Sequence, residues 1–153
     1  MRKMTELKEL DLKILKLLEK DSRQSYREMA KKLNVSHVNV SNRIQSMEQE
    51  GIIRGYTTIT NPDRLDYYAL CLRISADPGT DLSGIGRKIA ENDTIDVVLR
   101  VSGECELLAL AMCGSRDAAL QLLDEINDIP GIQKAESHVV LEAIKLGGIQ
   151  IKQ

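Results

Sequence analysis

The spacing of apolar residues changes along the chain, and this change divides the sequence into two parts. From residue 6 to residue 50, apolar side chains recur every three or four positions, which is typical of amphipathic helices. Beyond the tripeptide Asn61-Pro62-Asp63, alternating apolar and polar residues appear between further helical patterns, and such alternation is typical of strands. Because proline interrupts helices and central strands, the tripeptide predicts a linker between the two parts.

Three helices are expected before this linker. The first spans about residues 6–20, the second begins at Ser25 and the third begins at Ser36. Ser25 and Glu28 have the spacing of a capping box, in which each side chain accepts a hydrogen bond from the other residue's backbone N–H. Gly51 is expected to end the third helix in the left-handed conformation.

The second part is expected to contain four strands and two helices in the order βαββαβ. The strands are placed at residues 69–75, 95–101, 107–113 and 138–144, and the helices at 81–91 and 116–127. This order predicts a ferredoxin-like fold, in which both helices cover one face of a four-stranded antiparallel sheet. The other face would stay open and would carry Cys71, Val98 and Val140, and an open, partly apolar face favours dimerisation.

The expected fold class is therefore α+β, with an N-terminal three-helix domain and a C-terminal ferredoxin-like domain. Residues 53–60 are rich in Ile, Thr and Tyr, and they predict a connecting strand between the two domains. The expected boundaries are 1–53 for the first domain, 54–66 for the connecting strand and linker, and 67–153 for the second domain.

The second and third helices have the spacing of a helix-turn-helix, because only Asn34-Val35 separates them. Asparagine tolerates the left-handed conformation that such a sharp turn needs. The apolar residues that can lock the two helices together are Met29, Leu33, Val35, Val40 and Ile44. This arrangement points to a DNA-binding domain.

With Val40 and Ile44 buried, the third helix would expose a polar face. Asn and Gln side chains can pair with adenine, Arg with guanine or phosphate, and Val with the thymine methyl group. A merely solvated face is the alternative, although Glu, Lys and Ala would be favoured there. We predict contacts to double-stranded DNA from Ser25, Arg27, Ser36, His37, Val38, Asn39, Asn42, Arg43, Ser46 and Arg54. Replacement of Arg43 by alanine is expected to weaken this binding without unfolding the protein.

Charge is unevenly distributed between the two parts. Residues 1–64 contain 13 Lys and Arg against 9 Asp and Glu, a net charge of +4, and residues 65–153 contain 8 against 14, a net charge of −6. A basic part followed by an acidic part suggests two separate tasks. The chain has no Phe or Trp, and its four tyrosines precede residue 69, so base stacking on aromatic side chains is not the expected binding mode.

The composition, with 42% hydrophobic and 29% charged residues, is that of a soluble globular protein. No apolar stretch approaches the roughly 18 residues of a membrane span, and the charged N-terminus lacks the apolar core of a secretory signal. Cys71, Cys105 and Cys113 have no C-x-x-C spacing, which suggests reduced thiols in a cytoplasmic protein. With His37 and His138 as the only histidines, no metal site and no cofactor are expected.

The sequence also resembles the leucine-responsive and asparagine-synthetase regulator (Lrp/AsnC) family of transcription factors over nearly its whole length. In the first part the resemblance rests on Leu10-Asp11-Leu12-Lys13-Ile14-Leu15, Arg23-Gln24-Ser25, Met29-Ala30-Lys31-Lys32-Leu33-Asn34-Val35-Ser36, Val40-Ser41-Asn42-Arg43-Ile44 and Gln49-Glu50-Gly51-Ile52-Ile53-Arg54-Gly55-Tyr56. In the second part it rests on Val101-Ser102-Gly103 and Ile129-Pro130-Gly131-Ile132. It implies a transcription regulator that dimerises through its ferredoxin-like sheets and often assembles into tetramers or octamers.

The resemblance further implies an amino-acid-type effector bound between subunits, near the loop that contains Gly103. Free amides in this loop could hold a carboxylate, and Glu104 or Glu106 could accept hydrogen bonds from an ammonium group. The expected effector-binding residues are Ser102, Gly103, Glu104, Cys105, Glu106, Ser137 and His138. The chain departs from the family pattern at Glu106, where Asp is common, and at Asp66, where Gly is common. A simple turn between strands is the alternative for residues 103–106.

Two other functions are considered. Haem-pathway decarboxylases share this two-domain architecture by resemblance, but the acidic second part offers few of the His, Arg and Tyr side chains that a polyanionic tetrapyrrole would require. A co-regulator that only oligomerises with a DNA-binding relative is the other possibility, and the basic face expected of the third helix argues against it. The expectation is a regulator without catalytic residues, whose partners are DNA, further copies of itself and a small molecule, with no membrane.

Overall fold

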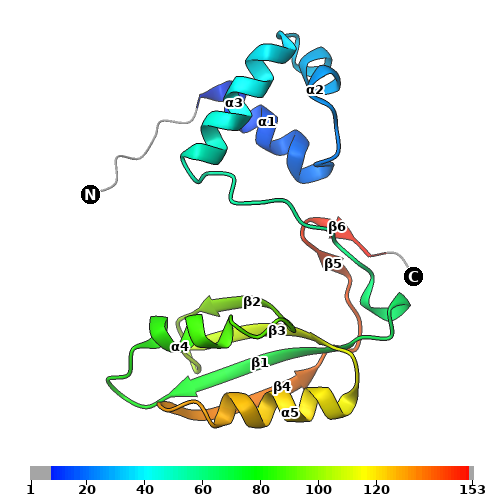
Figure 1. Cartoon of the computed structure of the whole chain (residues 1–153). Helices are drawn as coiled ribbons and strands as arrows, with labels where there is room; N and C mark the ends of the chain where they lie inside the picture. The colour runs from blue at the N-terminus through cyan, green and yellow to red at the C-terminus, as the bar shows by residue number, and fades with distance from the viewer. Residues whose placement is uncertain (1–7, 152–153) are drawn as a thin grey trace. The chain divides into compact units, whose positions relative to one another are not determined.

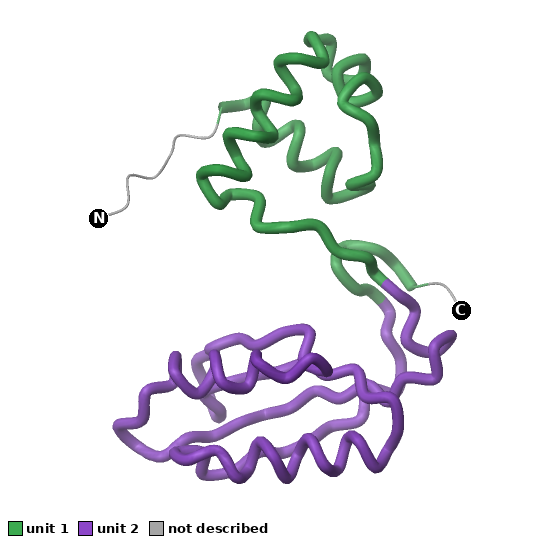
Figure 2. Tube along the Cα trace, in the orientation of Figure 1, with its two compact units in different colours: residues 1–59, 145–153 green, residues 60–144 purple. Residues whose placement is uncertain are grey.

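The computed structural model describes residues 8–151, which form two compact units (Figure 2). Unit 1 combines the described residues up to Ile59 with those from Lys145 onward, and unit 2 comprises Thr60–Ile144. The sequence instead placed residues 67–153 in one domain. The C-terminal segment packs with unit 1 because its backbone approaches Ile59 closely: a Cβ atom on Gly147 would lie 2.5 Å from Ile59 Cδ1.

Unit 1 contains three helices and a short hairpin (Figure 1), which are α1 Glu9–Lys20, α2 Tyr26–Leu33, α3 His37–Gln49, β5 Lys145–Leu146 and β6 Ile149–Gln150. The three predicted helices are confirmed, and residues 6 and 7 of the first prediction lie outside the described residues. Asn34, with φ 54°, and Gly51, with φ 70°, adopt the left-handed conformation. These two residues end α2 and α3 where the sequence indicated.

The core of unit 1 joins all three helices. Its buried residues are Ile14, Met29, Ala30, Val40, Ile44 and Met47, with Leu33 and Val35 packed against them. This set contains every apolar residue that the sequence assigned to the turn between α2 and α3. Burial of one face of α3 leaves the opposite face exposed to solvent.

Residues 54–60 form no strand, so the predicted connecting strand is wrong for the single chain. A strand requires a neighbouring strand with which to exchange backbone hydrogen bonds. Within the described residues, nothing in 54–60 makes a backbone–backbone hydrogen bond. The β-propensity of Ile, Thr and Tyr is present there, but a pairing partner is missing.

Unit 2 begins with a short 3-10 helix, η1 Pro62–Arg64, at the predicted linker. Its further elements are β1 Tyr68–Ala76, α4 Leu82–Ile89, β2 Ile95–Arg100, β3 Leu107–Cys113, α5 Arg116–Asn127 and β4 Ile132–Val139. The strands form an antiparallel sheet in the order β2-β3-β1-β4. The predicted α+β class and the βαββαβ order are therefore confirmed (Figure 1).

Both helices of unit 2 pack on the same face of this sheet. Alternate residues of β1 and β3 point into the core, beginning with Leu70 and Leu107. The helices contribute Ile85, Ile89, Ala119, Leu122 and Ile126 to the same cluster. On the other face of the central strands, Cys71 and Leu110 are only partly buried. They form the open face that the sequence predicted.

Two details of the sheet differ from the sequence-based prediction. The last strand spans Ile132–Val139 rather than 138–144, because the turn at Gly131 brings the chain directly alongside β1. Val98 packs against the core instead of lying on the open face. A register shift between Ile95 and Val97 inserts one extra residue in β2, and such a bulge reverses which side chains face the core.

Candidate nucleic-acid interface and effector loop

The outward face of α3 is a stripe of uncharged side chains. Val38, Asn42, Gln45 and Gln49 are all exposed, and their spacing of four, three and four residues places them on one side of the helix. Val38 is 52% exposed and is the apolar member of the stripe. The side chains of His37 and Asn39 are also exposed near the N-terminal end of the helix. This is the face that a helix-turn-helix presents to the major groove.

Arg43 lies beside this stripe and binds Asp11 of α1. Its Nε donates to Asp11 Oδ1 at 2.5 Å, and its Nη2 donates to Asp11 Oδ2. The Asp11 carboxylate is fully buried and also accepts the backbone N–H of Lys8 at 2.8 Å. The Arg43 guanidinium lowers the pKa of Asp11 below its ordinary value, with a further contribution from Lys8 and against the effect of burial. The pair connects α3 to α1, a role for Arg43 that sequence reasoning missed.

We expect unit 1 to lose stability in acid, because Asp11 must then take up a proton. A carboxyl whose pKa is lowered on folding stabilises the protein above its unfolded pKa of about 3.9, and this contribution disappears as the pH falls through the folded pKa. Urea unfolding from about pH 6 to about pH 2 should therefore show a falling free energy of unfolding below about pH 4. Asp11→Asn should reduce this fall in the free energy of unfolding. An equally steep fall in the variant would contradict the role given to Asp11.

Three serines predicted to contact DNA have structural partners for their hydroxyl groups. Ser25 Oγ accepts from the Glu28 N–H at 3.2 Å, while Glu28 Oε2 accepts from the Ser25 N–H at 2.7 Å, which confirms the predicted capping box. Ser36 caps α3 by accepting from the Asn39 N–H at 3.1 Å. The Ser46 hydroxyl donates to Glu50 Oε1 at 2.8 Å, so a carboxylate lies next to Ser46.

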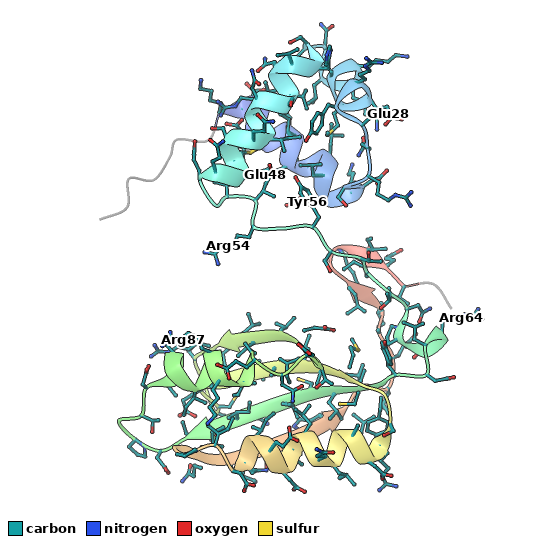
Figure 3. All side chains as sticks on the ribbon, viewed as in Figure 1. Glu28, Glu48, Arg54, Tyr56, Arg64 and Arg87 are labelled. Carbon is teal, nitrogen blue, oxygen red and sulfur yellow. The ribbon has the colours of Figure 1, made fainter. Side chains whose placement is uncertain are left out.

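Exposed cations surround the helix-turn-helix without lying on the α3 stripe. Arg27 and Lys31 belong to α2, and Arg54 follows α3. Close to Arg54, the Tyr56 hydroxyl donates to Glu48 Oε1 at 2.8 Å and ties the chain leaving α3 to the end of that helix (Figure 3). These cations are suited to contacts with phosphate groups, which hold a protein on DNA without reading sequence.

In unit 2, the loop predicted to bind an effector connects β2 with β3. Ser102, Gly103 and Glu104 are exposed, whereas Cys105 is buried. Gly103 has φ 129° and open space around the position of a Cβ atom. Glu106 Oε2 accepts the Ala76 N–H at 3.1 Å. The Glu106 carboxylate thus holds the loop on β1, a different task from the ammonium contact that the sequence suggested.

The other carboxylate of this loop reaches the open face of the sheet. Glu104 Oε2 lies 2.8 Å from Nη2 of Arg73 in β1. Arg73 is paired in register with Glu136 of β4, and Cys71 with His138, so these side chains share one face. Ser137 is exposed on the same edge strand. Sequence reasoning missed Arg73, although a single arginine within an apolar strand was a visible signal.

Other kinds of site find little support in the described part of the chain. No group of three His, Cys, Asp or Glu side chains in residues 8–151 is arranged to hold a metal ion. Cys71, Cys105 and Cys113 are free thiols, and burial raises the pKa of Cys113. Among the described helices, none has the length and apolar character needed to cross a bilayer.

Comparison with known proteins identifies both parts of the chain. Residues 7–54 match the winged helix-turn-helix DNA-binding family, and residues 70–149 match the Lrp/AsnC ligand-binding domain. An uncharacterised HTH-type transcriptional regulator of Pyrococcus furiosus is 36% identical over 140 residues, covering 92% of this chain and 95% of its relative. The decarboxylase alternative is not favoured, because the relatives are transcription regulators.

Solved structures agree with this assignment. E. coli AsnC has a TM-score of 0.75 and 28% identity, with 93% of this chain and 97% of that chain covered. A transcriptional regulator of Neisseria meningitidis, solved as a complex with L-Met, has a TM-score of 0.77 and 24% identity, with 92% and 94% covered. From its matched domains and its relatives, the chain belongs to the Lrp/AsnC family of DNA-binding transcription regulators.

Proposed function

We propose that the chain binds specific DNA sequences as an oligomer and that an amino acid bound to unit 2 modulates this binding. The observation that carries the proposal is the exposed stripe of Val38, Asn42 and Gln45 on a helix fixed by its core and by Asp11. Groups that hydrogen-bond to base edges give sequence specificity only when the helix that bears them is held rigidly.

Oligomerisation is supported by the open face of the unit 2 sheet. Leu108, Leu110 and Met112 of β3 are partly buried there beside Val97 and Leu99 of β2. Leu99 is 52% exposed in the single chain. An apolar face of this kind is stabilised by covering it, and a second copy related by a two-fold axis would cover the same patch on both subunits.

The amino-acid effector is proposed to bind at the loop of residues 102–106. Arg73 carries a positive charge that can hold an α-carboxylate, and Glu104 carries a negative charge that can hold an α-ammonium group. An amino acid could therefore replace the Arg73–Glu104 ion pair with two pairs of its own. The regulator of the same fold from N. meningitidis, solved with L-Met, lends support to this class of ligand.

The proposal is tested by selecting binding sites from random DNA and measuring affinity by fluorescence anisotropy, with and without each of the twenty amino acids. The full chain should bind the selected site at least about a thousand times more tightly than random DNA. An effective amino acid should change this affinity by roughly 5- to 150-fold, the effect of a coupling of 1–3 kcal/mol. Gly103→Val should remove the response and leave DNA binding in place, because φ 129° strains any side chain.

Equal affinity for selected and random DNA would overturn the DNA-binding part of the proposal. If the chain binds a specific site but no amino acid alters its affinity, the DNA-binding part of the proposal stands. Residues 103–106 would then form a simple turn. A response retained at full size in Gly103→Val would place the effector elsewhere.

A further inference from the structure

The only guanidinium group on α3 is already engaged within the protein. Residues His37–Gln49 include one arginine and no lysine. That arginine, Arg43, gives its Nε and Nη2 to the buried carboxylate of Asp11, and 24% of its side chain is exposed. A bidentate arginine is the commonest reader of guanine, because two of its N–H groups match guanine O6 and N7. The pair with Asp11 occupies two N–H groups of this fork.

The groups left free on the outward face of α3 favour A·T pairs over G·C pairs. Asn42 and Gln45 present carboxamides, and within the described residues neither one makes a side-chain hydrogen bond to the rest of the protein. A carboxamide donates to adenine N7 and accepts from adenine N6, which gives a bidentate pair with adenine. One turn before Asn42 lies Val38, an exposed valine whose methyl groups can contact the thymine methyl.

Resting on the proposed function, the geometry points to an operator whose half-sites present A·T pairs, not G·C pairs, to Val38, Asn42 and Gln45. Exposed cations such as Arg27 on α2 and Arg54 after α3 lie off this stripe, where they are suited to contacts with phosphate groups. Asp11 thus shapes the specificity of a helix on which it does not lie. By holding Arg43 away from the groove, it leaves amides and a valine as the base-reading groups.

The inference is tested by site selection from random duplex DNA with the full chain, with two variants of the stripe and with one control variant. The wild type should enrich half-sites with A·T pairs at the central contacted positions. Asn42→Ala should bind the selected site roughly 5- to 150-fold more weakly, the loss expected for one bidentate base contact. Gln133→Ala, which removes an exposed carboxamide from β4, is the matched control and should bind as the wild type does.

The second variant, Gln45→Arg, places an unpaired guanidinium on the stripe and should convert one selected base pair to G·C. Circular dichroism checks that each variant keeps its helices. Enrichment of G·C at the central positions by the wild type would overturn the inference and leave the proposed function intact. Enrichment of no sequence at all would overturn the proposed function itself, so the two failures are distinguishable.

Discussion

Replacing Arg43 with alanine should lower the free energy of unfolding of unit 1 by about 3–5 kcal/mol, the range measured when one member of a buried ion pair is removed. The cost comes from Asp11, whose carboxylate has no exposed surface and would be left without a cation. The measurement is the urea midpoint of the transition that unfolds α1 to α3. This expectation replaces the one drawn from sequence, in which the same substitution affected DNA binding alone.

Asp11 and Arg43 differ in exposure, so replacing each by alanine should have a different effect on stability. Asp11→Ala should cost less than Arg43→Ala, because the Arg43 side chain is 24% exposed and can turn toward water. Lys13→Ala, which breaks the exposed Lys13–Glu9 pair, is the control and should leave the midpoint unchanged. The double variant Asp11→Leu with Arg43→Met should recover much of the loss. An Arg43→Ala protein as stable as the wild type would refute the structural role.

Leu110→Glu should convert the proposed oligomer into single chains of 17.1 kDa. Leu110 lies opposite Cys71 on one side and Val97 on the other, at the centre of the open face of the sheet. A two-fold interface would bury the new carboxylate twice, and burying an unpaired charge is among the most costly substitutions known. Light scattering at micromolar concentration measures the mass, and DNA affinity should fall with it, because one chain occupies a single half-site.

Leu120→Glu provides the matched control for this prediction. Leu120 is 52% exposed on α5, and the helices cover the opposite face of the sheet, so the same change there should leave the mass of the oligomer unaltered. A Leu110→Glu protein with the wild-type mass would place the interface elsewhere. A wild-type chain that is itself monomeric would remove the basis for oligomerisation through this face.

The sequence was most informative where local chemistry determines structure. Ser25 with Glu28, Asn34 and Gly51 each specify a helix boundary through their own backbone and side-chain preferences, and all are found as expected. The buried set between α2 and α3 follows from helical spacing alone. These features depend on residues within a few positions of one another, so a single sequence contains all the information they require.

Sequence reasoning failed where the outcome depends on residues far apart in the chain. Five of the eight residues of β4 are polar, and the segment forms a strand because β1 lies beside it. The ion pair of Arg43 with Asp11 was missed because the two residues are 32 positions apart, and that of Glu104 with Arg73 because they are 31 positions apart. An ionised side chain finds the nearest opposite charge in space, and neither spacing nor periodicity reveals which one that is.

The return of the chain to unit 1 at Lys145 makes unit 2 an insertion within the DNA-binding unit. The two connections leave unit 2 side by side, because they extend neighbouring strands joined by the hydrogen bond from Val140 N–H to Ala69 O at 2.9 Å. The chain therefore crosses between the two units twice, once on each side of unit 2. A change in how β4 lies against β1 therefore has two covalent routes out of unit 2, one through each connection.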